Sequence, residues 1–252
     1  EFTLKKKPLR RTHRSEGLVL TSWAGLSEYL QSSPQDILSI RFNPSERKRL
    51  DKLLAQYPVK CLVQEDESET SFAAAVQVKT LDEEQFLAEV QGNPDDQFIV
   101  ACDHVTDTRN LGAIARTCAY FGVCYLLLPK DRQAPITSGT LGAAQGAFAH
   151  VKPVIVTNLS RMLKILQEEG YWLICADMDG VPIGNIKQSY EKKVLILGSE
   201  DRGVSQNLQK HCDLTVSVNT QFPQLESLNV SVAAGILIHA LHAPSMISKK
   251  SE

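Results

Sequence analysis

The chain has 252 residues, which is enough for two modest domains or for one large domain with a tail. Hydrophobic residues make up 43% and charged residues 22%, the proportions of an ordinary globular protein, and no apolar run approaches the roughly 18 residues of a membrane span. The net charge of −2 excludes a uniformly basic protein that coats nucleic acid, so a role with RNA has to depend on local patches.

Two basic patches lie in the first quarter of the chain. Residues 1–14 are predicted to be a flexible arm. Its basic residues are Lys5, Lys6, Lys7, Arg10, Arg11 and Arg14. A second basic run, over residues 41–52, lies on and just before a predicted helix. RNA contact and plain solvated surface both explain these charges.

Residues 15–91 are predicted to form a small α/β domain. Its predicted strands are the apolar runs at 37–42, 59–63 and 72–78. Asn43 and Pro44 are typical of a helix start, and a charged helix follows them. Thr80 and Glu83 fit a capping box that opens a second helix.

Residues 92–97 combine Gly, Asn, Pro and Asp and are predicted to be a linker. Beyond it, over residues 98–252, strands and helices alternate, which indicates a mainly parallel sheet covered on both faces. The predicted strands lie at 98–102, 123–128, 171–176 and 194–197. The predicted helices lie at 110–121, 158–169 and 228–241. The fold class is therefore α/β.

Six cysteines are scattered along the chain, with no Cys-x-x-Cys pair, and several lie inside apolar runs. The start of the chain also lacks the apolar core of a secretion signal. We therefore predict reduced thiols, a cytoplasmic location, no membrane association and no metal site.

Three short segments of the second half combine glycine and polar residues beside apolar runs. They run from Asn110 to Arg116, from Leu197 to Gly203, and from Ser227 to Ala234. Taken singly, each is compatible with a helix start or a turn. The chain contains neither Gly-x-Gly-x-x-Gly nor a Walker A sequence, so it gives little support to a dinucleotide or NTPase site.

Residue chemistry leaves open what these segments do. Arg116 lies in an otherwise uncharged helix, so it is either exposed or held by a buried anion, because an unpaired buried charge is costly. Gly198 follows a strand and permits close approach of backbone to a ligand. His104 precedes the first segment, and a solvent contact at a strand end is its simpler interpretation.

In this order and spacing, the three segments resemble the motifs of the SpoU/TrmH family of the SPOUT superfamily. These are RNA 2′-O-ribose methyltransferases that use S-adenosylmethionine (AdoMet). The likeness is closest in type to the bacterial 23S rRNA guanosine-2′-O-methyltransferases. The seven residues from Ser227 to Ala233 carry the most specific match. The resemblance implies a parallel-sheet domain with a deep trefoil knot, preceded by a small RNA-binding domain, and a homodimer.

The resemblance also implies roles for individual residues. Catalytic roles fall on Asn110, Arg116, Glu200, Ser227 and Asn229. The cofactor positions are Leu197, Gly198, Val218 and Leu228. Arg132 lies in the loop expected to face the substrate, and with the basic residues of the arm from Lys5 to Arg11 it is predicted to bind RNA. Because a guanidinium holds its proton too strongly to be an ordinary base, we expect Arg116 to bind the target phosphate and polarise the ribose hydroxyl.

One segment departs from the family pattern. Residues 218–226 are one residue longer than the usual Ile-Pro-x-x-Gly stretch and lack its glycine, which affects the expected cofactor loop. This departure supports an alternative, a non-catalytic RNA-binding or ribosome-assembly factor with the same fold. Retention of all five expected catalytic residues favours the enzyme. The separate first domain favours ribosomal RNA as the substrate over transfer RNA, the other alternative.

Overall fold

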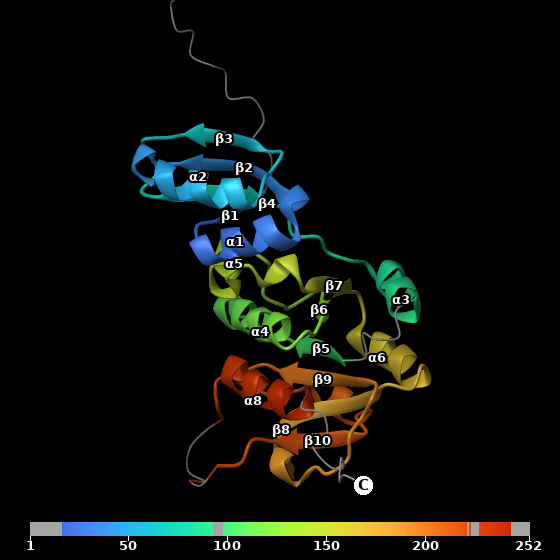
Figure 1. The fold of residues 1–252 in the computed structure, drawn as a ribbon. Helices are drawn as coiled ribbons and strands as arrows, with labels where there is room; N and C mark the ends of the chain where they lie inside the picture. The colour runs from blue at the N-terminus through green and yellow to red at the C-terminus, as the bar shows by residue number, and fades with distance from the viewer. Residues whose placement is uncertain (1–16, 93–97, 221, 223–226, 243–252) are drawn as a thin grey trace, which may run out of the picture.

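Two β-sheets organise the protein in the computed structural model, which describes residues 17–92, 98–220, 222 and 227–242 (Figure 1). The first sheet has the order β1-β4-β2-β3, with β2 and β3 parallel and the other pairs antiparallel. Its elements are β1 (Leu18–Leu20), α1 (Trp23–Ser32), η1 (Pro34–Asp36), β2 (Ile37–Phe42), η2 (Pro44–Glu46), α2 (Arg47–Gln56), β3 (Leu62–Glu65) and β4 (Phe72–Val76). The three strands and the first helix predicted for this region are therefore present, with β3 displaced by about three residues at its start.

The start of α2 follows from its sequence. The Asn43 side chain accepts a hydrogen bond from the Ser45 backbone N–H at 3.0 Å, and Pro44 occupies the first position of η2. Proline has no N–H to lose at a helix start, and its fixed φ suits the first turn. The chain therefore leaves β2 through one 3₁₀ turn directly into α2.

The second sheet has six parallel strands in the order β10-β8-β9-β5-β6-β7. Its strands are β5 (Phe98–Asp103), β6 (Tyr125–Pro129), β7 (Lys152–Val156), β8 (Trp172–Pro182), β9 (Lys193–Gly198) and β10 (Leu214–Ser217). The remaining elements are α3 (Glu83–Gly92), α4 (Thr108–Tyr120), α5 (Ser138–Ala144), η3 (Ala147–Ala149), α6 (Leu159–Glu168), η4 (Ile183–Asn185), α7 (Gln206–Gln209) and α8 (Val230–His242).

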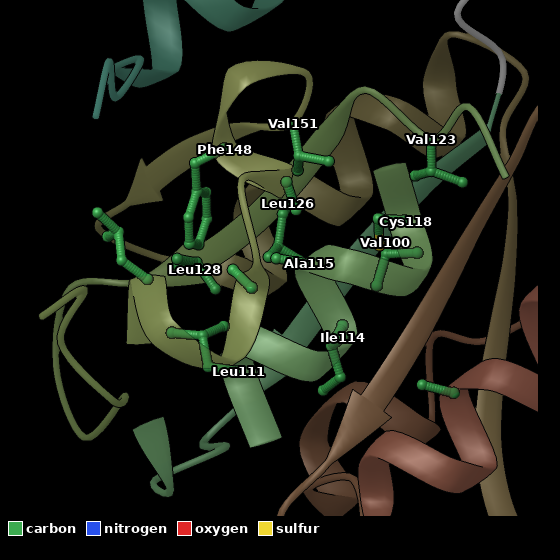
Figure 2. Packing of buried hydrophobic residues seen from close by; sticks show 14 of the residues in the cluster. Val100, Leu111, Ile114, Ala115, Cys118, Val123, Leu126, Leu128, Phe148 and Val151 are labelled. Atoms are coloured by element: carbon green, nitrogen blue, oxygen red, sulfur yellow. The ribbon is translucent and has the colours of Figure 1, made fainter. Parts of the chain in front are cut away.

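Helices cover both faces of this sheet, as the apolar strands predict. Successive side chains of β5 point to opposite faces, so Val100 joins the cluster beneath α4 and α8, whereas Ile99 joins the cluster beneath α3 and α6. Figure 2 shows the first of these, in which Leu111 and Ile114 of α4 lie over the sheet. This packing fixes the helix that carries the first sequence motif.

Helix α3 belongs to the second sheet rather than to the domain in which we expected it. Its Phe86 and Val90 are buried in the cluster beneath α6, and Leu81 forms a bridge to Val154 of β7. The change of packing partner therefore falls between β4 and Leu81, ahead of the predicted linker at 92–97, of which residues 93–97 lie outside the described part.

The helix cap of α3 also differs from the prediction. The Asp82 N–H donates to Gln85 Oε1 at 3.1 Å, and the Gln85 N–H donates to Asp82 Oδ1 at 2.8 Å. This reciprocal pair is a capping box two residues later than the one expected from Thr80. The physical reason is the bridge made by Leu81, which keeps the chain extended up to that residue.

Strands β1, β7 and β10 were not predicted from the sequence, because each has only three to five residues and no clear alternation. The trefoil knot stays a prediction; the strand order is compatible with it.

All six cysteines are free thiols. Within the described residues, no helix is long and apolar enough to cross a bilayer. The same residues contain no group of three or more His, Cys, Asp or Glu side chains that could hold a metal ion.

The first sheet is attached to the second through α1 and the α5–η3 segment, which lie side by side in Figure 1. The Val19 N–H donates to Ser138 Oγ at 2.9 Å, and Ser22 Oγ donates to Gln145 Oε1 at 2.9 Å. Gly146 has a φ of +93°, and a Cβ there would lie 2.9 Å from the Gly25 Cα. The two backbones therefore pack in direct contact.

Candidate functional site

The candidate site lies at the carboxyl ends of β5 and β9, the two central strands of the parallel sheet. Asp103 and Gly198 end these strands and are register partners. Helix α4 follows β5, and the second motif follows β9. Ligands of open α/β sheets bind at the carboxyl ends of the strands, so this edge is where a site is expected.

Helix α4 starts two residues before Asn110. Asn110 is therefore not the N-cap of this helix, although its motif taken singly is compatible with a helix start. The cap is Asp107, whose side chain accepts a hydrogen bond from the Arg109 N–H at 2.7 Å. This carboxylate satisfies the helix start and leaves the Asn110 amide available for other partners.

Asn110 joins the second and third motifs. Its Nδ2 donates a hydrogen bond to Glu200 Oε1, and its Oδ1 accepts one from Asn229 Nδ2 at 3.1 Å. Asn229 itself caps α8, because its Oδ1 accepts from the Ser231 N–H at 2.9 Å. Three of the five residues predicted to be catalytic thus form one hydrogen-bonded cluster, although they are up to 119 positions apart in the chain.

The loop after β9 folds tightly against the end of that strand. Ser199 and Gly203 exchange two backbone hydrogen bonds of 2.9 and 3.1 Å, and Gly203 has a φ of +64°. A Cβ on Gly198 would lie 1.9 Å from the carbonyl carbon of Gly203, so only glycine fits at position 198. This hairpin holds Glu200 in place beside Asn110.

Asp103 and His104 form a second polar group at the same edge, which sequence reasoning underrated. The Asp103 side chain is only 4% exposed, and its Oδ1 lies 2.7 Å from His104 Nδ1. Its Oδ2 accepts a hydrogen bond from the Ser205 N–H at 2.7 Å. His104 is therefore held by a buried carboxylate and does not simply face solvent; the Asp-His pair at a strand end was the available signal.

The pKa of the neighbouring Cys102 thiol depends on its burial and on the negative charges at this edge. Burial, and to a smaller extent the negative charges of Asp103 and Glu200, raise the pKa of its thiol to about 12. A thiol with such a pKa stays protonated at neutral pH, so Cys102 serves the core and not the chemistry.

The other predicted residues do not join the cluster. Arg116 is exposed on α4, and Ser227 is exposed before α8; neither has a hydrogen bond or ion pair within the described residues. The turn of an α-helix places residues 110 and 116 on different faces, which explains the separation of Arg116 from Asn110. Arg132 is exposed as well. The basic residues from Lys5 to Arg11 lie outside the described part.

Among the predicted cofactor positions, Leu197 is buried, Val218 is half-buried, and Leu228 is 49% exposed. All of them follow or end strands at the carboxyl edge or precede α8. Of the atypical loop, residues 221 and 223–226 lie outside the described part, so the effect of its extra length stays a prediction.

Comparison with known proteins places these motifs in a family. The model of the SpoU rRNA methylase family matches residues 97–239, more than half of the chain. The chain belongs to the SpoU rRNA methylase family. Its matched region runs from just before β5 into α8 and so contains the whole cluster of Asn110, Glu200 and Asn229.

Two curated proteins illustrate the sequence similarity. An uncharacterized tRNA/rRNA methyltransferase of Borreliella burgdorferi is 32% identical over 209 residues, which are 81% of this chain and 86% of that protein. One of Archaeoglobus fulgidus is 38% identical over 144 residues, 57% of this chain and 63% of that protein. The first of these likenesses is longer than the region that the family model matches.

Solved structures of SpoU proteins share the fold. The SpoU methyltransferase AviRb from Streptomyces viridochromogenes, in complex with AdoMet, superposes with a TM-score of 0.73 at 17% identity, covering 89% of this chain and 88% of that one. The TrmH/SpoU tRNA modifying enzyme of A. aeolicus gives 0.52 at 27% identity over 64% of this chain and 82% of its own. The mainly parallel α/β fold predicted from the sequence is thereby confirmed.

Proposed function

We propose that this SpoU-family protein transfers a methyl group from AdoMet to a ribose 2′-hydroxyl of structured RNA. The observation that carries the proposal is the cluster of Asn110, Glu200 and Asn229, which assembles one residue from each of the three motifs at the carboxyl edge of the sheet. An RNA-binding factor without turnover has no need for this convergence.

The residues around Gly198 fit the proposed cofactor. The backbone of Gly203 and Val204 packs on Gly198 with no room for a side chain, which fixes the main chain at the end of β9, where we propose that AdoMet binds. The half-buried Val218 and the exposed Leu228 offer apolar surface for a purine ring. When bound, AdoMet supplies a methyl group that its sulfonium centre makes electrophilic.

The chain's own residues then have to hold and orient the ribose. Glu200, fixed by Asn110, presents its second carboxylate oxygen as an acceptor for a ribose hydroxyl. Arg116 supplies a guanidinium that binds the target phosphate and polarises the hydroxyl, and Ser227 is close in sequence to the cluster and shapes the pocket. Roles at both residues come from the family resemblance.

A homodimer explains the exposed position of Arg116. Tyr120 lies one helical turn after Arg116 and is 83% exposed, and α8 packs beside α4 with Val232 and Ile236 exposed by 50% and 39%. A second copy of the chain covers this apolar face and brings Arg116 to an interface.

Ribosomal RNA is the favoured substrate over transfer RNA, because the first sheet is a separate unit fixed on α5 that enlarges the surface for a folded RNA. The proposal includes an N-terminal RNA-binding domain and a cytoplasmic location.

Incorporation of labelled methyl groups tests the proposal. Purified protein is incubated with labelled AdoMet and unmodified transcripts of 16S rRNA, 23S rRNA and tRNA, followed by alkaline hydrolysis, which leaves a 2′-O-methylated linkage intact. Label in alkali-resistant dinucleotides from rRNA is the expected result. Label in mononucleotides indicates base methylation instead, and RNA binding without label supports the non-catalytic alternative.

A further inference from the structure

Two loops at the carboxyl edge of the second sheet each hold a non-glycine residue in the left-handed region. His104, after β5, has a φ of +63°, and Arg132, after β6, has a φ of +54°. Residues with a Cβ adopt this conformation at a cost, and they persist in it where surrounding contacts fix them. Strands β5 and β6 are neighbours, so the two strained residues lie on adjacent loops.

The two loops are fastened to each other through Val105. Gln133 Oε1 accepts a hydrogen bond from the Val105 N–H at 3.1 Å, and Gln133 Nε2 donates to the Val105 carbonyl at 2.8 Å. The same carbonyl accepts from the Ala134 N–H at 2.9 Å. These three hydrogen bonds at Val105 hold the two loops together as a rigid unit. His104 precedes Val105 and Arg132 precedes Gln133, so both are held in the left-handed conformation.

His104 is also fixed through its ring. Nδ1 faces the buried Asp103 carboxylate at 2.7 Å, so this nitrogen carries the proton. Nε2 has no partner within the described residues, and the side chain is 34% exposed. The guanidinium of Arg132 is likewise exposed and without an ion pair there. Within the described residues, the His104 Nε2 and the Arg132 guanidinium thus both lack a protein partner at this edge.

We propose that His104, on the loop next to the one that carries Arg132, contacts the sugar–phosphate backbone of the substrate RNA beside the target ribose, together with the RNA contact already expected of Arg132. With its proton on Nδ1, the imidazole of His104 offers Nε2 as an acceptor for a ribose hydroxyl, whereas the guanidinium of Arg132 donates to phosphate oxygens. Such contacts fix the register of a nucleic acid on a protein. The place fits, because Asp103 lies beside Gly198 in register and His104 precedes the helix that carries Asn110. The inference rests on the proposed function for the identity of the ligand.

Four variants of the full chain test the site: His104→Asn, His104→Gly, Arg132→Ala, and Lys164→Ala as a control for loss of an exposed charge on α6. Asparagine tolerates the left-handed region and still donates to Asp103, but it lacks the ring. Glycine removes the backbone strain altogether. Binding of 16S, 23S and tRNA transcripts is measured on filters over a range of KCl concentrations, beside AdoMet affinity, melting temperature and, where methylation is seen, KM and kcat.

We expect both His104 variants to weaken RNA binding about fivefold, the net effect of losing one hydrogen bond to a ribose hydroxyl. In Arg132→Ala, the slope of log affinity against log salt should fall by about one. The AdoMet affinity should stay within twofold of wild type in all of these variants, and the KM for RNA should rise in step with the loss of RNA binding. Lys164→Ala should behave as wild type.

Wild-type RNA affinity in both His104 variants overturns the proposal, and so does a loss of AdoMet affinity, which would place His104 in the cofactor site. A wild-type protein that binds no transcript also overturns it. Failure of the proposed function looks different: the wild type then binds RNA without transferring a methyl group, and the binding measurements still decide the role of His104.

Discussion

The side-chain amide of Asn229 donates to Asn110 Oδ1 at 3.1 Å and so connects the start of α8 to the first turns of α4. The orientation of both amides follows from this contact. Ser231 N–H donates to Asn229 Oδ1, which leaves the Asn229 Nδ2 for Asn110 and, in turn, the Asn110 Nδ2 for Glu200. The carboxylate of Glu200 is therefore the acceptor at the end of a chain of donors.

Replacing Asn110 by aspartate removes the N–H group that donates a hydrogen bond to Glu200. In Asn110→Asp the new carboxylate faces Glu200 without a proton to share, so we expect a loss of about 10- to 100-fold in kcat for RNA methylation and a lower melting temperature. The melting difference should narrow at about pH 4, where a carboxyl is protonated and donates again. Asn207→Asp on the exposed surface of α7 is the control. Equal kcat in the two variants would show that the cluster is structural only.

Gly198 offers a test of the cofactor site. In Gly198→Ala the Cβ meets the Gly203 carbonyl carbon at 1.9 Å and the Val204 nitrogen at 2.1 Å, so the backbone of the hairpin has to move. We expect calorimetric titration to show at least a tenfold loss of AdoMet affinity. Gly184→Ala, which meets nothing within 4 Å, should bind normally.

A milder variant covers the case in which Gly198→Ala does not fold. Gly203→Ala introduces strain through the φ of +64°, with its nearest neighbour, Asp177 Oδ2, at 3.4 Å. Circular dichroism checks that the variant is folded. Unchanged AdoMet affinity in a folded Gly198→Ala protein would contradict the assignment of the hairpin to the cofactor.

Because the Cys102 thiol is buried, we expect the free energy of unfolding to fall at alkaline pH. Burial raises the pKa of its thiol from the ordinary 9.0 to about 12 in the folded protein. Below about pH 9 the thiol is protonated in both states; between pH 9 and 12 only the unfolded state loses the proton. The free energy of unfolding should therefore fall by about 1.4 kcal/mol per pH unit for this thiol over that window.

Urea unfolding at several pH values from 8 to 10.5 measures this slope. Cys102→Ala should be less stable than wild type at pH 8 because it leaves a cavity, but its stability should decline less steeply with pH. Cys102→Ser leaves a smaller cavity than alanine, also without an ionisable thiol, and should show the same shallower slope. Parallel curves for wild type and both variants would contradict the buried thiol as the source.

Sequence reasoning reached the parallel sheet because its strands are buried on both faces and read as continuous apolar runs. Ile99, Val100 and Ala101 all lie in the core, split between its two faces. Short strands such as β10, with only four residues, do not carry enough pattern to be found this way. Helix starts were shifted where tertiary contacts intervene, as the bridge from Leu81 to β7 shows.

The sequence could predict several residues that belong to the candidate site, but not which of them contact one another. Asn110, Glu200 and Asn229 were identified by motif, and the structure adds that they bind one another. The partnership of Asp103 with His104, and the fastening of Gln133 to Val105, join residues on loops whose spacing has no periodicity. Such contacts depend on which strands become neighbours, and the sequence pattern does not determine that order.

The exposed face of α8 predicts the oligomeric state. Val232 and Ile236 lie one turn apart and are exposed by 50% and 39%, although α8 is otherwise packed on the core. In Ile236→Asp a charge replaces an apolar side chain at the centre of the proposed interface, where it has no partner and little water. We expect light scattering to give about twice the chain mass of 27.9 kDa for wild type and about 27.9 kDa for the variant.

The matched control for this variant is Leu62→Asp, on β3, where the original side chain is 65% exposed. It introduces the same charge on a face that the proposed dimer leaves open, so it should remain dimeric. Because Arg116 lies on the neighbouring helix, the monomeric Ile236→Asp protein should also lose methylation while the folded monomer keeps its melting transition. A dimer in Ile236→Asp, or full activity in its monomer, would separate Arg116 from the interface and place its phosphate contact within one chain.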